Sequence, residues 1–412
     1  MTAQIRAVVA PGRFSRLGVA VSGGGDSVAL LHLLAAQPDR PALNAVTVDH
    51  GLRPEAASEA AAVAQLCAGL GVPHETLRWQ GWDGRGNLSD AARRARYTLM
   101  ADWARAHDVE AVALGHTADD QAETFLMRLA RGAGLDGLSA MATERAAWGA
   151  LWLRPLLAAP RADLRAFLRD LGAQWAEDPS NDDPSYDRVR ARAVLTALAP
   201  LGISVGGIAD VTAHLREVRE VVARATYIAA QQILRVEVGD LLFDRAGFAS
   251  HPPELRRRLL AQGLRWVASA DYAPRAAPLA DLIKTILAGG TATLHGCLVL
   301  QEGPWFRICR EPVAVANCRA APGALWDGRW RLTGPDEKRC EIRALGDVGL
   351  RLCPNWRSQP RPRAALLADP AVWREGELVA APLAGMGQNW SAELGHGGRG
   401  GADDFLSALL SH

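Results

Sequence analysis

The sequence predicts an α/β fold, in which an N-terminal parallel sheet carries helices on both faces and is followed by a mostly helical domain and a small α+β domain. Three short apolar runs, at 17–21, 44–48 and 109–114, are each followed by a longer segment with the apolar spacing of a helix. Strands that alternate with helices are typical of parallel sheets. Polar or glycine-rich residues follow each apolar run, and such folds bind ligands beyond the carboxyl ends of their strands.

Local signals place the elements of the first domain in order. Pro54 suits the first turn of a helix, Gly71 ends that helix, and Asn87 or Ser89 can cap the next one. The expected elements are a strand at 17–21, a helix at 28–36, a strand at 44–48, a helix at 56–70, a strand at 74–79, a helix to about 107, a strand at 109–114 and helices at 118–131 and 160–171.

A chain of 412 residues is long enough for two or three domains. Segments at 208–234, 255–266 and 279–287 have helical patterns, and 291–300 has a β-like pattern. The expected domains are an N-terminal α/β domain at 1–203, a mostly helical domain at 204–312, a small α+β domain at 324–390 and a glycine-rich tail with a short helix at 391–412.

Composition favours a cytoplasmic protein without a membrane span. Hydrophobic residues make up 49% of the chain and charged residues 22%, and no apolar run approaches the length of a transmembrane helix. The six cysteines form no CxxC pair, so disulfides and a zinc finger are both disfavoured. Lys284 and Lys338 are the only lysines, and any contact with RNA phosphate would therefore be made mainly by arginine.

The turn after the first strand has the composition of a phosphate-binding loop. It reads Ser22, Gly23, Gly24, Gly25, Asp26, Ser27, between an apolar strand and an apolar helix. Glycines let backbone N–H groups approach phosphate oxygens, and a helix N-terminus adds partial positive charge. The loop is neither a Walker A sequence nor a G-x-G-x-x-G sequence. Phosphate contacts here must come from backbone N–H groups, hydroxyls, arginine or a metal ion.

Polar residues also follow the other two strands. Asp49 and His50 follow the apolar run at 44–48, and Gly115 and His116 follow the run at 109–114. In the helix that follows, Asp120 and Glu123 share one face, where two carboxylates can hold Mg²⁺ beside a triphosphate. The alternative is that acids in a first turn only complement the helix dipole, which does not explain the histidine.

Five motifs in this order make the first domain resemble the tRNA(Ile)-lysidine synthetases of the PP-loop ATP pyrophosphatase group. They are SGGGDS at 22–27, DHGLR at 49–53, GHTADDQAET at 115–124, RPLL at 154–157 and EDPSN at 177–181. CPNWR at 353–357 resembles the family's Pro-Pro-Trp-Arg segment, with Cys353 and Asn355 as departures, and the arginines at 188–192 resemble its arginine-rich segment.

The resemblance implies an adenine nucleotide α-hydrolase-like fold and an ATP-dependent ligase. Such an enzyme adenylates the C2 carbonyl oxygen of the wobble cytidine of tRNA(Ile) with a CAU anticodon, and free L-lysine then displaces AMP to give lysidine. The resemblance thereby implies that 1–203 is the PP-loop, ATP-binding catalytic domain and that 204–312 binds tRNA. ATP, Mg²⁺, L-lysine and this tRNA are the implied cofactors and partners, and a homodimer is also considered.

The resemblance also implies a set of site residues. Asp26, Asp120 and Glu123 are expected to be catalytic and to hold metal. ATP is expected at Ser22, Gly23, Gly24, Gly25, Asp26, Ser27, Asp49, His50, Gly115 and His116. Transfer RNA is expected at Arg154, Arg188, Arg190, Arg192, Trp356, Arg357 and Arg361. The base that deprotonates the lysine amine is left open among Asp136, Glu144 and Asp178.

Two other functions remain open at this point. A tRNA thiolase of the same ATP-binding group would use cysteine pairs, whereas the first domain contains only Cys67. A nucleotide-binding module without ligase activity would not need the acidic helix or the additional domains.

Overall fold

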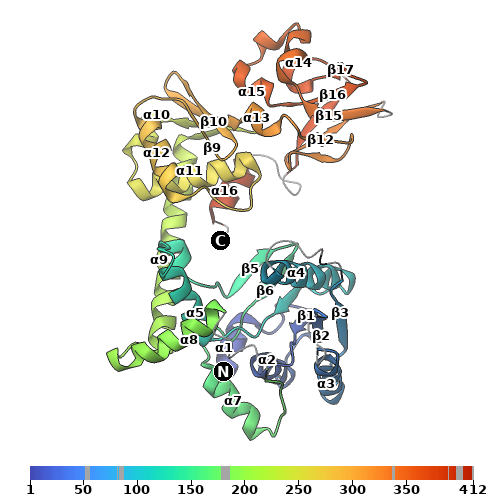
Figure 1. The fold of residues 1–412 in the computed structure, drawn as a ribbon, viewed down its shortest axis with the longest axis vertical. Coiled ribbons are helices and arrows are strands. Elements are labelled where there is room, and N and C mark those ends of the chain that lie inside the picture. Colours follow the sequence, from blue (N-terminus) through green and yellow to red (C-terminus); the bar gives the residue numbers. More distant parts are fainter. Residues whose placement is uncertain are drawn as a thin grey trace. The chain divides into compact units, whose positions relative to one another are not determined.

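A computed structural model describes residues 1–51, 56–80, 82, 88–177, 186–335, 339–387, 389–395 and 402–410 (Figure 1). The chain divides into two units, Met1–Arg219 and Glu220–His412. The finer division at 204–312, 324–390 and 391–412 stays a prediction.

The first unit is built on a six-stranded sheet in the order β3-β2-β1-β4-β6-β5. Five strands are parallel, and the edge strand β5 pairs antiparallel with β6. The strands are β1 (Arg16–Ala20), β2 (Ala42–Asp49), β3 (His74–Arg78), β4 (Ala111–Ala113), β5 (Glu144–Ala147) and β6 (Ala150–Leu153). This confirms the predicted α/β class and its alternation of strands and helices.

Alternate residues of these strands enter different cores, because side chains on a strand point to opposite faces. Ala111 and Ala113 belong to a cluster with α1, α2, α3 and α7, whereas Val112 packs with α4. The helices are α1 (Thr2–Val8), α2 (Gly25–Ala35), α3 (Ala56–Gly69), α4 (Leu88–Ala106), α5 (Ala118–Leu129), α6 (Leu135–Leu138), α7 (Arg161–Asp170) and α8 (Asp187–Leu198), with a 3₁₀ turn η2 (Ala199–Leu201). The sheet therefore has helices on both faces, as expected.

The second unit begins with a five-stranded antiparallel sheet in the order β7-β8-β11-β10-β9. Its strands are β7 (Leu234–Glu237), β8 (Asp240–Asp244), β9 (Ala292–Leu294), β10 (Cys297–Glu302) and β11 (Trp305–Arg310), and it packs with α10 (Arg245–Ser250), α11 (Pro253–Ala268) and α12 (Ala276–Leu287). The predicted helices are present. The sheet is more extensive than the single β-like segment at 291–300 indicated.

The remaining residues of the second unit form two small sheets, β12-β15-β16-β17 and β13-β14-β18. Their strands are β12 (Arg319–Ala320), β13 (Leu325–Trp326), β14 (Trp330–Thr333), β15 (Cys340–Ala344), β16 (Pro370–Arg374), β17 (Glu377–Ala380) and β18 (Ser391–Leu394). The helical segments are α13 (Pro312–Val315), α14 (Gly346–Leu352), η3 (Trp356–Ser358), α15 (Arg363–Leu367), η4 (Pro382–Ala384) and α16 (Ala402–Leu410).

The last helix, α16, is part of a core rather than a free tail. Phe405 and Leu409 are buried in the cluster formed by α11, α12 and the five-stranded sheet. The indole of Trp266 on α11 donates to Asp404 at 2.9 Å. The segment predicted as a tail therefore contributes both β18 and α16 to the second unit.

Buried ion pairs connect the five-stranded sheet to the segment around α15. Asp240 on β8 accepts from Arg307 at 3.0 Å and from Arg361 at 3.0 Å, and Arg361 also donates to Asp369 at 2.5 Å. All four side chains are at most 5% exposed. These charges are compensated within the protein interior, as buried charges must be.

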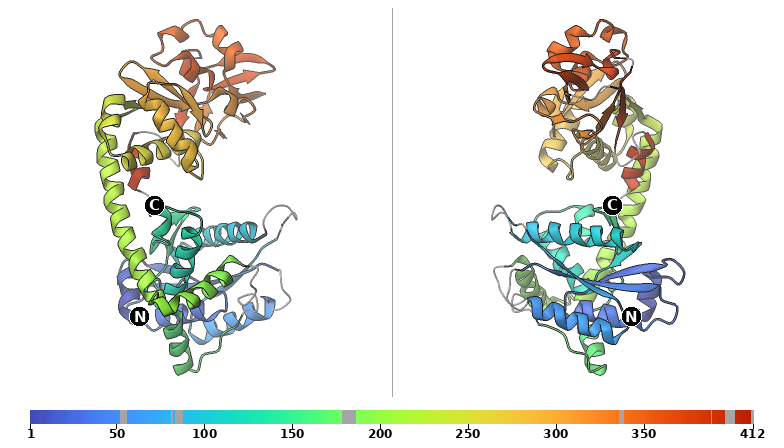
Figure 2. Two further views of the ribbon diagram at one scale, coloured as in Figure 1. Left: turned by 60° about the vertical axis from the view of Figure 1, so that its left-hand side comes forward. Right: turned by 90° about the vertical axis from the view of Figure 1, so that its right-hand side faces the viewer.

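The long helix α9 (Val205–Ile233) runs from the first unit into the second and is one continuous element (Figure 2). Among the described residues, no single helix is long and apolar enough to cross a membrane. By length and composition alone, the bent pair 187–201 and 205–233 passes the same criterion, with a bend of 100°.

Candidate functional site

The glycine-rich loop joins β1 to α2 with a geometry that only glycine adopts easily. Gly23 has φ +89°, Gly24 precedes the first turn of α2, and Gly25 begins the helix. The Ser27 hydroxyl accepts from the Ser22 backbone N–H at 3.1 Å and donates to the Gly24 carbonyl at 2.9 Å. The loop is thus held by its own residues, with the N-terminus of an eleven-residue helix at its end.

Gly115 brings the loop after β4 against this phosphate-binding loop. A Cβ placed on Gly115 would lie 2.9 Å from the Ser27 Cα and 3.0 Å from the Asp26 carbonyl oxygen. Both neighbours are backbone atoms, so the clash cannot be relieved by a side-chain rotation. The carboxyl edges of β1 and β4 therefore meet here, as the sequence predicts.

We expect Gly115→Ala to displace the loop and to raise the KM for ATP by roughly tenfold or more, because small displacements at a reacting site are costly. Steady-state pyrophosphate release over a range of ATP concentrations measures this. Gly69→Ala on α3 is the matched control, since its Cβ would meet nothing within 4 Å. An unchanged KM in Gly115→Ala would contradict the close approach.

Asp120 performs two tasks at the start of α5. Its Oδ2 accepts from the Thr117 backbone N–H at 2.8 Å and from the Thr117 hydroxyl at 2.9 Å, which completes a capping box. Its Oδ1 lies 3.4 Å from Arg161 and 3.7 Å from Arg188. Burial opposes ionisation of this carboxyl, yet the surrounding charges lower its pKa. Asp120 is therefore a buried carboxylate stabilised by arginines.

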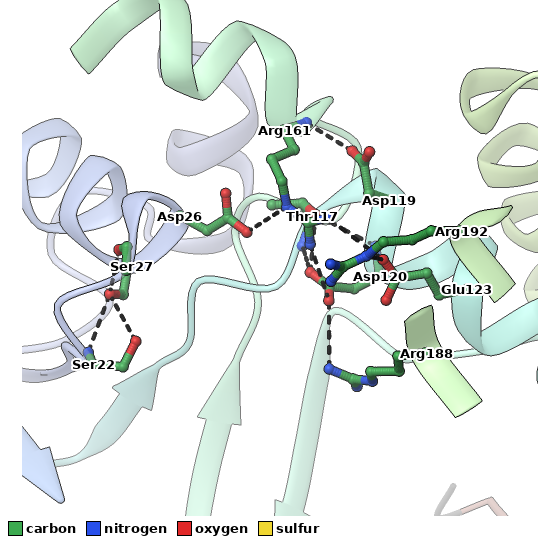
Figure 3. A network of polar contacts seen from close by, with 11 residues as sticks. Ser22, Asp26, Ser27, Thr117, Asp119, Asp120, Glu123, Arg161, Arg188 and Arg192 are labelled. Carbon is green, nitrogen blue, oxygen red and sulfur yellow. Dashed lines mark hydrogen bonds and ion pairs between the residues drawn. The ribbon is translucent and has the colours of Figure 1, made fainter. Parts of the chain in front are cut away.

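Arg161, the first residue of α7, is the centre of the site (Figure 3). Its Nε donates to Asp26 Oδ2 at 2.8 Å, and its Nη1 lies 3.5 Å from Glu123 Oε1. Its backbone N–H donates to Asp119 at 2.7 Å. The guanidinium is only 17% exposed, so it occupies the space among the three acids that were predicted to hold metal.

Glu123 is the most deeply buried of these acids, with a side chain that is 0% exposed. Its Oε1 accepts from Arg192 Nε on α8 at 2.6 Å. Its Oε2 is buried without a hydrogen-bond partner in the described structure. Glu123 therefore holds two arginines, from α7 and α8, in place beside the loop.

The predicted three-carboxylate metal site stays a prediction. Asp26, Asp120 and Glu123 do lie near one another, but each is engaged by arginine. The described residues contain no group of three or more His, Cys, Asp or Glu side chains that could hold a metal ion. Arginine supplies positive charge beside all three acids, and the side chains of Asp120 and Glu123 are more buried than that of Asp26.

The two predicted histidines differ in detail. Burial, together with nearby arginines, lowers the pKa of His116 to about 3, so this ring is neutral at physiological pH. Its Nδ1 is buried without a partner in the described structure. His50 packs edge-on against Trp79 with ring centroids 5.8 Å apart, and burial lowers its pKa as well. Asp49 accepts from the Gly51 N–H at 2.8 Å and shapes the turn that carries His50.

The arginines predicted to bind tRNA fall into two groups. Arg190 is exposed on α8 and pairs with Asp187, whereas Arg188 is half-buried and Arg192 is the partner of Glu123. Arg154 is instead buried and donates to the Ala142 carbonyl at 2.9 Å. A contact between Arg154 and tRNA is therefore wrong for this structure, because its guanidinium is not accessible.

In the second unit, Arg357 is exposed and lies over the ring of Trp356, 4.5 Å from its centroid. Arg361 is buried between Asp240 and Asp369. The prediction that Arg361 contacts tRNA is wrong for the same reason as that for Arg154. Trp356 and Arg357 stay predicted contacts.

The candidates for the lysine base are also separated by the structure. Arg13 pairs with Glu144 and lowers its pKa, which makes Glu144 a weak base. Asp136 is exposed in the first turn of α6. Asp178, like residues 52–53 and 179–181 of the predicted motifs, lies outside the described residues.

Sequence reasoning missed Arg161, whereas Asp119 was expected as a residue that could face the site together with Glu123. A basic residue in the first turn of a helix interacts unfavourably with the helix dipole. Arg161 at the start of α7 therefore indicates that acidic residues elsewhere in the chain compensate its charge. Its partner Asp26 is 135 residues away, so local spacing could not identify the pair.

Comparison with known proteins identifies relatives of this chain. Residues 1–198 match the PP-loop domain family. A tRNA(Ile)-lysidine synthase from Ruegeria pomeroyi is 52% identical over 96% of this chain and 94% of its own length. One from Hyphomonas neptunium is 40% identical over 72% of this chain and 81% of its own length. Among solved structures, a U34-tRNA thiolase from Methanococcus maripaludis overlaps 52% of this chain and 77% of its own, at 16% identity and a TM-score of 0.45, too low to bear on function.

Proposed function

This chain belongs to the tRNA(Ile)-lysidine synthase family, and from that premise we propose that it uses ATP to join L-lysine to C2 of the wobble cytidine of tRNA(Ile). This cytidine belongs to the CAU anticodon of the tRNA. Its O2 attacks the α-phosphorus of ATP and diphosphate leaves. The lysine ε-amine then attacks C2, loses a proton, and AMP leaves with the O2 oxygen. We place this reaction in the cytoplasm.

The observation that carries the proposal is the meeting of the glycine-rich loop with a cluster of arginines from α7 and α8. Backbone N–H groups of Gly23 to Ser27 would contact the diphosphate end of ATP. Arg161 and Arg188 would offset the charge that develops on the phosphates during adenylation. Asp26, Asp120 and Glu123 would position these guanidinium groups.

Mg²⁺ fits this site best at Asp26, the most exposed of the three carboxylates. Magnesium is commonly bound by one or two carboxylates together with substrate phosphates, and Asp26 is a partly exposed carboxylate at the start of α2. When bound, the ion would neutralise phosphate charge. The chain's own contribution would be to hold Asp26 through Arg161 at 2.8 Å, although burial raises the pKa of this carboxyl.

Pyrophosphate release tests the function. ATP with tRNA(Ile) and lysine should release diphosphate and yield lysidine, detected by nucleoside mass spectrometry. Omission of lysine should stop lysidine formation, and methionine tRNA should not replace tRNA(Ile). Diphosphate release that is independent of tRNA would overturn the proposal.

The thiolase alternative finds no support in the catalytic unit. Cys67 is the only cysteine before Cys297, and it lies in the core between α3 and the sheet. Burial raises its pKa to about 11, so a thiolate is not available at neutral pH.

Exposed arginines near Trp356 are expected to contact tRNA phosphates. Replacing Arg351 and Arg357 with glutamine should weaken tRNA binding and reduce the slope of log affinity against log salt by about one unit or more. Both side chains are exposed, so the fold should be retained. Filter binding over a salt series measures the slope.

Lys284→Gln is a matched control, since Lys284 is exposed and pairs with Asp281 on α12. Turnover at saturating tRNA should be unchanged in the double variant. A normal salt slope would remove Arg351 and Arg357 from the tRNA surface.

A further inference from the structure

The turn between β5 and β6 carries an exposed tryptophan in a conformation that tryptophan rarely adopts. Trp148 and Gly149 form the two-residue loop of this hairpin, with φ +53° and +78°. Asparagine followed by glycine is the favoured pair for such a turn, whereas a bulky residue with positive φ strains the backbone. The Trp148 side chain is 42% exposed, so burial offsets only part of this cost. Strain at an exposed side chain is typical of functional positions.

One face of the Trp148 ring is fixed by the protein. It stacks on Tyr97 of α4, which lies beside the hairpin, with ring centroids 4.5 Å apart and an interplanar angle of 20° (Figure 1). Tyr97 is itself buried and packs edge-on against Trp152 of β6, with centroids 4.7 Å apart. The indole is thereby held in one orientation, with the rest of its surface open to solvent.

Two exposed arginines lie against these rings. The guanidinium carbon of Arg145 lies 5.4 Å from the centroid of the Trp148 ring, and that of Arg93 lies 5.2 Å from the centroid of the Tyr97 ring. Neither arginine makes an ion pair in the part of the chain that the structure describes. Both positive charges are therefore available to a ligand.

Acidic residues are scarce in this part of the sequence. Residues 145–162 include no aspartate or glutamate. Glu144, the acid that precedes Arg145, accepts from Arg13 at 2.7 Å, so its charge is compensated. The hairpin therefore presents positive charge together with an aromatic ring.

The positive potential extends from the hairpin toward the candidate site. Burial lowers the pKa of Arg154, which follows β6, and the charges of Arg145 and Arg93 lower it further. Burial also lowers the pKa of His116, and Arg154 adds to that effect. Trp148 precedes the carboxyl end of β6 by five residues, about 16 Å of extended chain. The hairpin is therefore too far from that edge of the sheet to touch the reacting nucleotide, and close enough to contact a neighbouring one.

We propose that the Trp148 hairpin is a second nucleotide-binding site, in which the indole stacks on an unpaired base that flanks the reacting cytidine while Arg93 and Arg145 bind the adjoining phosphates. The inference deepens the proposed function and rests on it, because the RNA is the tRNA substrate. Aromatic rings beside arginines are a common way to hold single-stranded RNA. Arg145 lies over the indole in the free protein and would move to a phosphate when a base takes that place.

The neighbours of Trp148 favour RNA over a protein partner. A protein interface surrounds such a ring with an apolar core. Here the exposed neighbours are Arg93, Arg145, Ala146 and Gly149, which offer little apolar surface. Base stacking needs only the ring and nearby positive charge.

Trp148→Asn separates the role of the side chain from that of the fold, because asparagine suits this turn better than tryptophan does. The variant should melt close to the wild-type temperature, yet bind tRNA(Ile) about tenfold more weakly or worse, the scale of one lost stacking contact. The slope of log affinity against log salt should be unchanged, since no phosphate contact is removed. Filter binding over a salt series and thermal melts by circular dichroism measure these quantities. Trp148→Phe should keep most of the affinity.

Arg93→Gln with Arg145→Gln should have the complementary effect and reduce the salt slope by about one unit or more. Arg94→Gln is the matched control, because Arg94 is the next residue on α4 and already pairs with Asp90. In steady state, the asparagine variant and the arginine pair should both raise the KM for tRNA and leave kcat at saturating tRNA near the wild-type value. Neither set of changes touches the glycine-rich loop. A fall in kcat with an unchanged KM would contradict a binding role.

Wild-type affinity in Trp148→Asn, or an equal loss of affinity in Trp148→Phe, would overturn stacking on the indole. A normal salt slope in the arginine pair would overturn the phosphate contacts. The wild type reports separately on the proposed function: if it makes no lysidine, that function is wrong. Normal lysidine formation together with unchanged tRNA binding in both variants would overturn the hairpin site alone.

Discussion

Replacing Glu123 with alanine is expected to lower lysidine formation by roughly a hundredfold or more, the scale seen when a transition-state contact is lost. Glu123 Oε1 accepts from Arg192 at 2.6 Å and lies 3.5 Å from Arg161, so its removal takes an anionic partner from both guanidinium groups beside the loop. The substitution also removes the counter-charge of two partly buried arginines. Single-turnover lysidine formation at saturating ATP, lysine and tRNA measures the effect.

Added Mg²⁺ should not rescue this variant, because Glu123 binds arginines rather than metal. Asp120→Asn is a useful second variant, because asparagine can still accept from the Thr117 N–H. It keeps the helix cap and removes only the negative charge. Asp163→Ala is the control: Asp163 is exposed on α7, two residues after Arg161. Near-normal turnover in Glu123→Ala, or recovery at high Mg²⁺, would contradict the positioning role.

Asp240→Ala is expected to destabilise the second unit by about 3–5 kcal/mol, the cost of breaking a buried ion pair by removing one partner. Asp240 accepts from both Arg307 and Arg361, whose side chains are 1% and 3% exposed. Without it, two buried positive charges lose a shared counter-ion. Arg307 retains Glu302 and Glu237, and Arg361 retains Asp369, so the larger loss is expected around Arg361.

Urea denaturation and hydrogen exchange at β8 and β11 amides measure this loss. Asp281→Ala provides the control, because Asp281 pairs with Lys284 in full exposure to solvent and should leave stability unchanged. An Asp240→Ala protein as stable as the wild type would show that the network contributes little.

The parts of the fold that could be predicted have local signals. The glycines at 23–25 and the threonine cap at Thr117 mark helix starts by themselves, and the strands of the first sheet are apolar runs between them. The sheet of the second unit was largely missed because its strands lack alternation. In β11 four consecutive residues are buried, and one of them is Arg307. A buried arginine is tolerated within a strand because acidic partners compensate its charge, here Asp240 and Glu302, and the sequence does not show these contacts.

The candidate site divides in the same way. Its carboxylates could be predicted because Asp26, Asp120 and Glu123 lie in recognisable loops and helix starts. Their arginine partners could not, because Arg161 and Arg192 are brought to them by α7 and α8 from 38 or more residues away. Arg361 was predicted to be an exposed contact because Arg357 and Arg363, which are close to it in sequence, are basic and exposed. Its acidic partner Asp240 lies 121 residues earlier, so the sequence did not reveal its burial.

The position of α16 has a consequence for how the chain is made. Domains fold during synthesis from the N-terminus onward, and the first unit can complete its sheet as soon as residue 219 has emerged from the ribosome. The core around α11 is different, because Phe405 and Leu409 belong to it. That core stays open, with Trp266 and its neighbours uncovered, until α16 has also emerged from the ribosome. The newly made second unit is therefore exposed to proteases and aggregation for longer than the first unit, and a ribosome that stalls before α16 would leave it in that state.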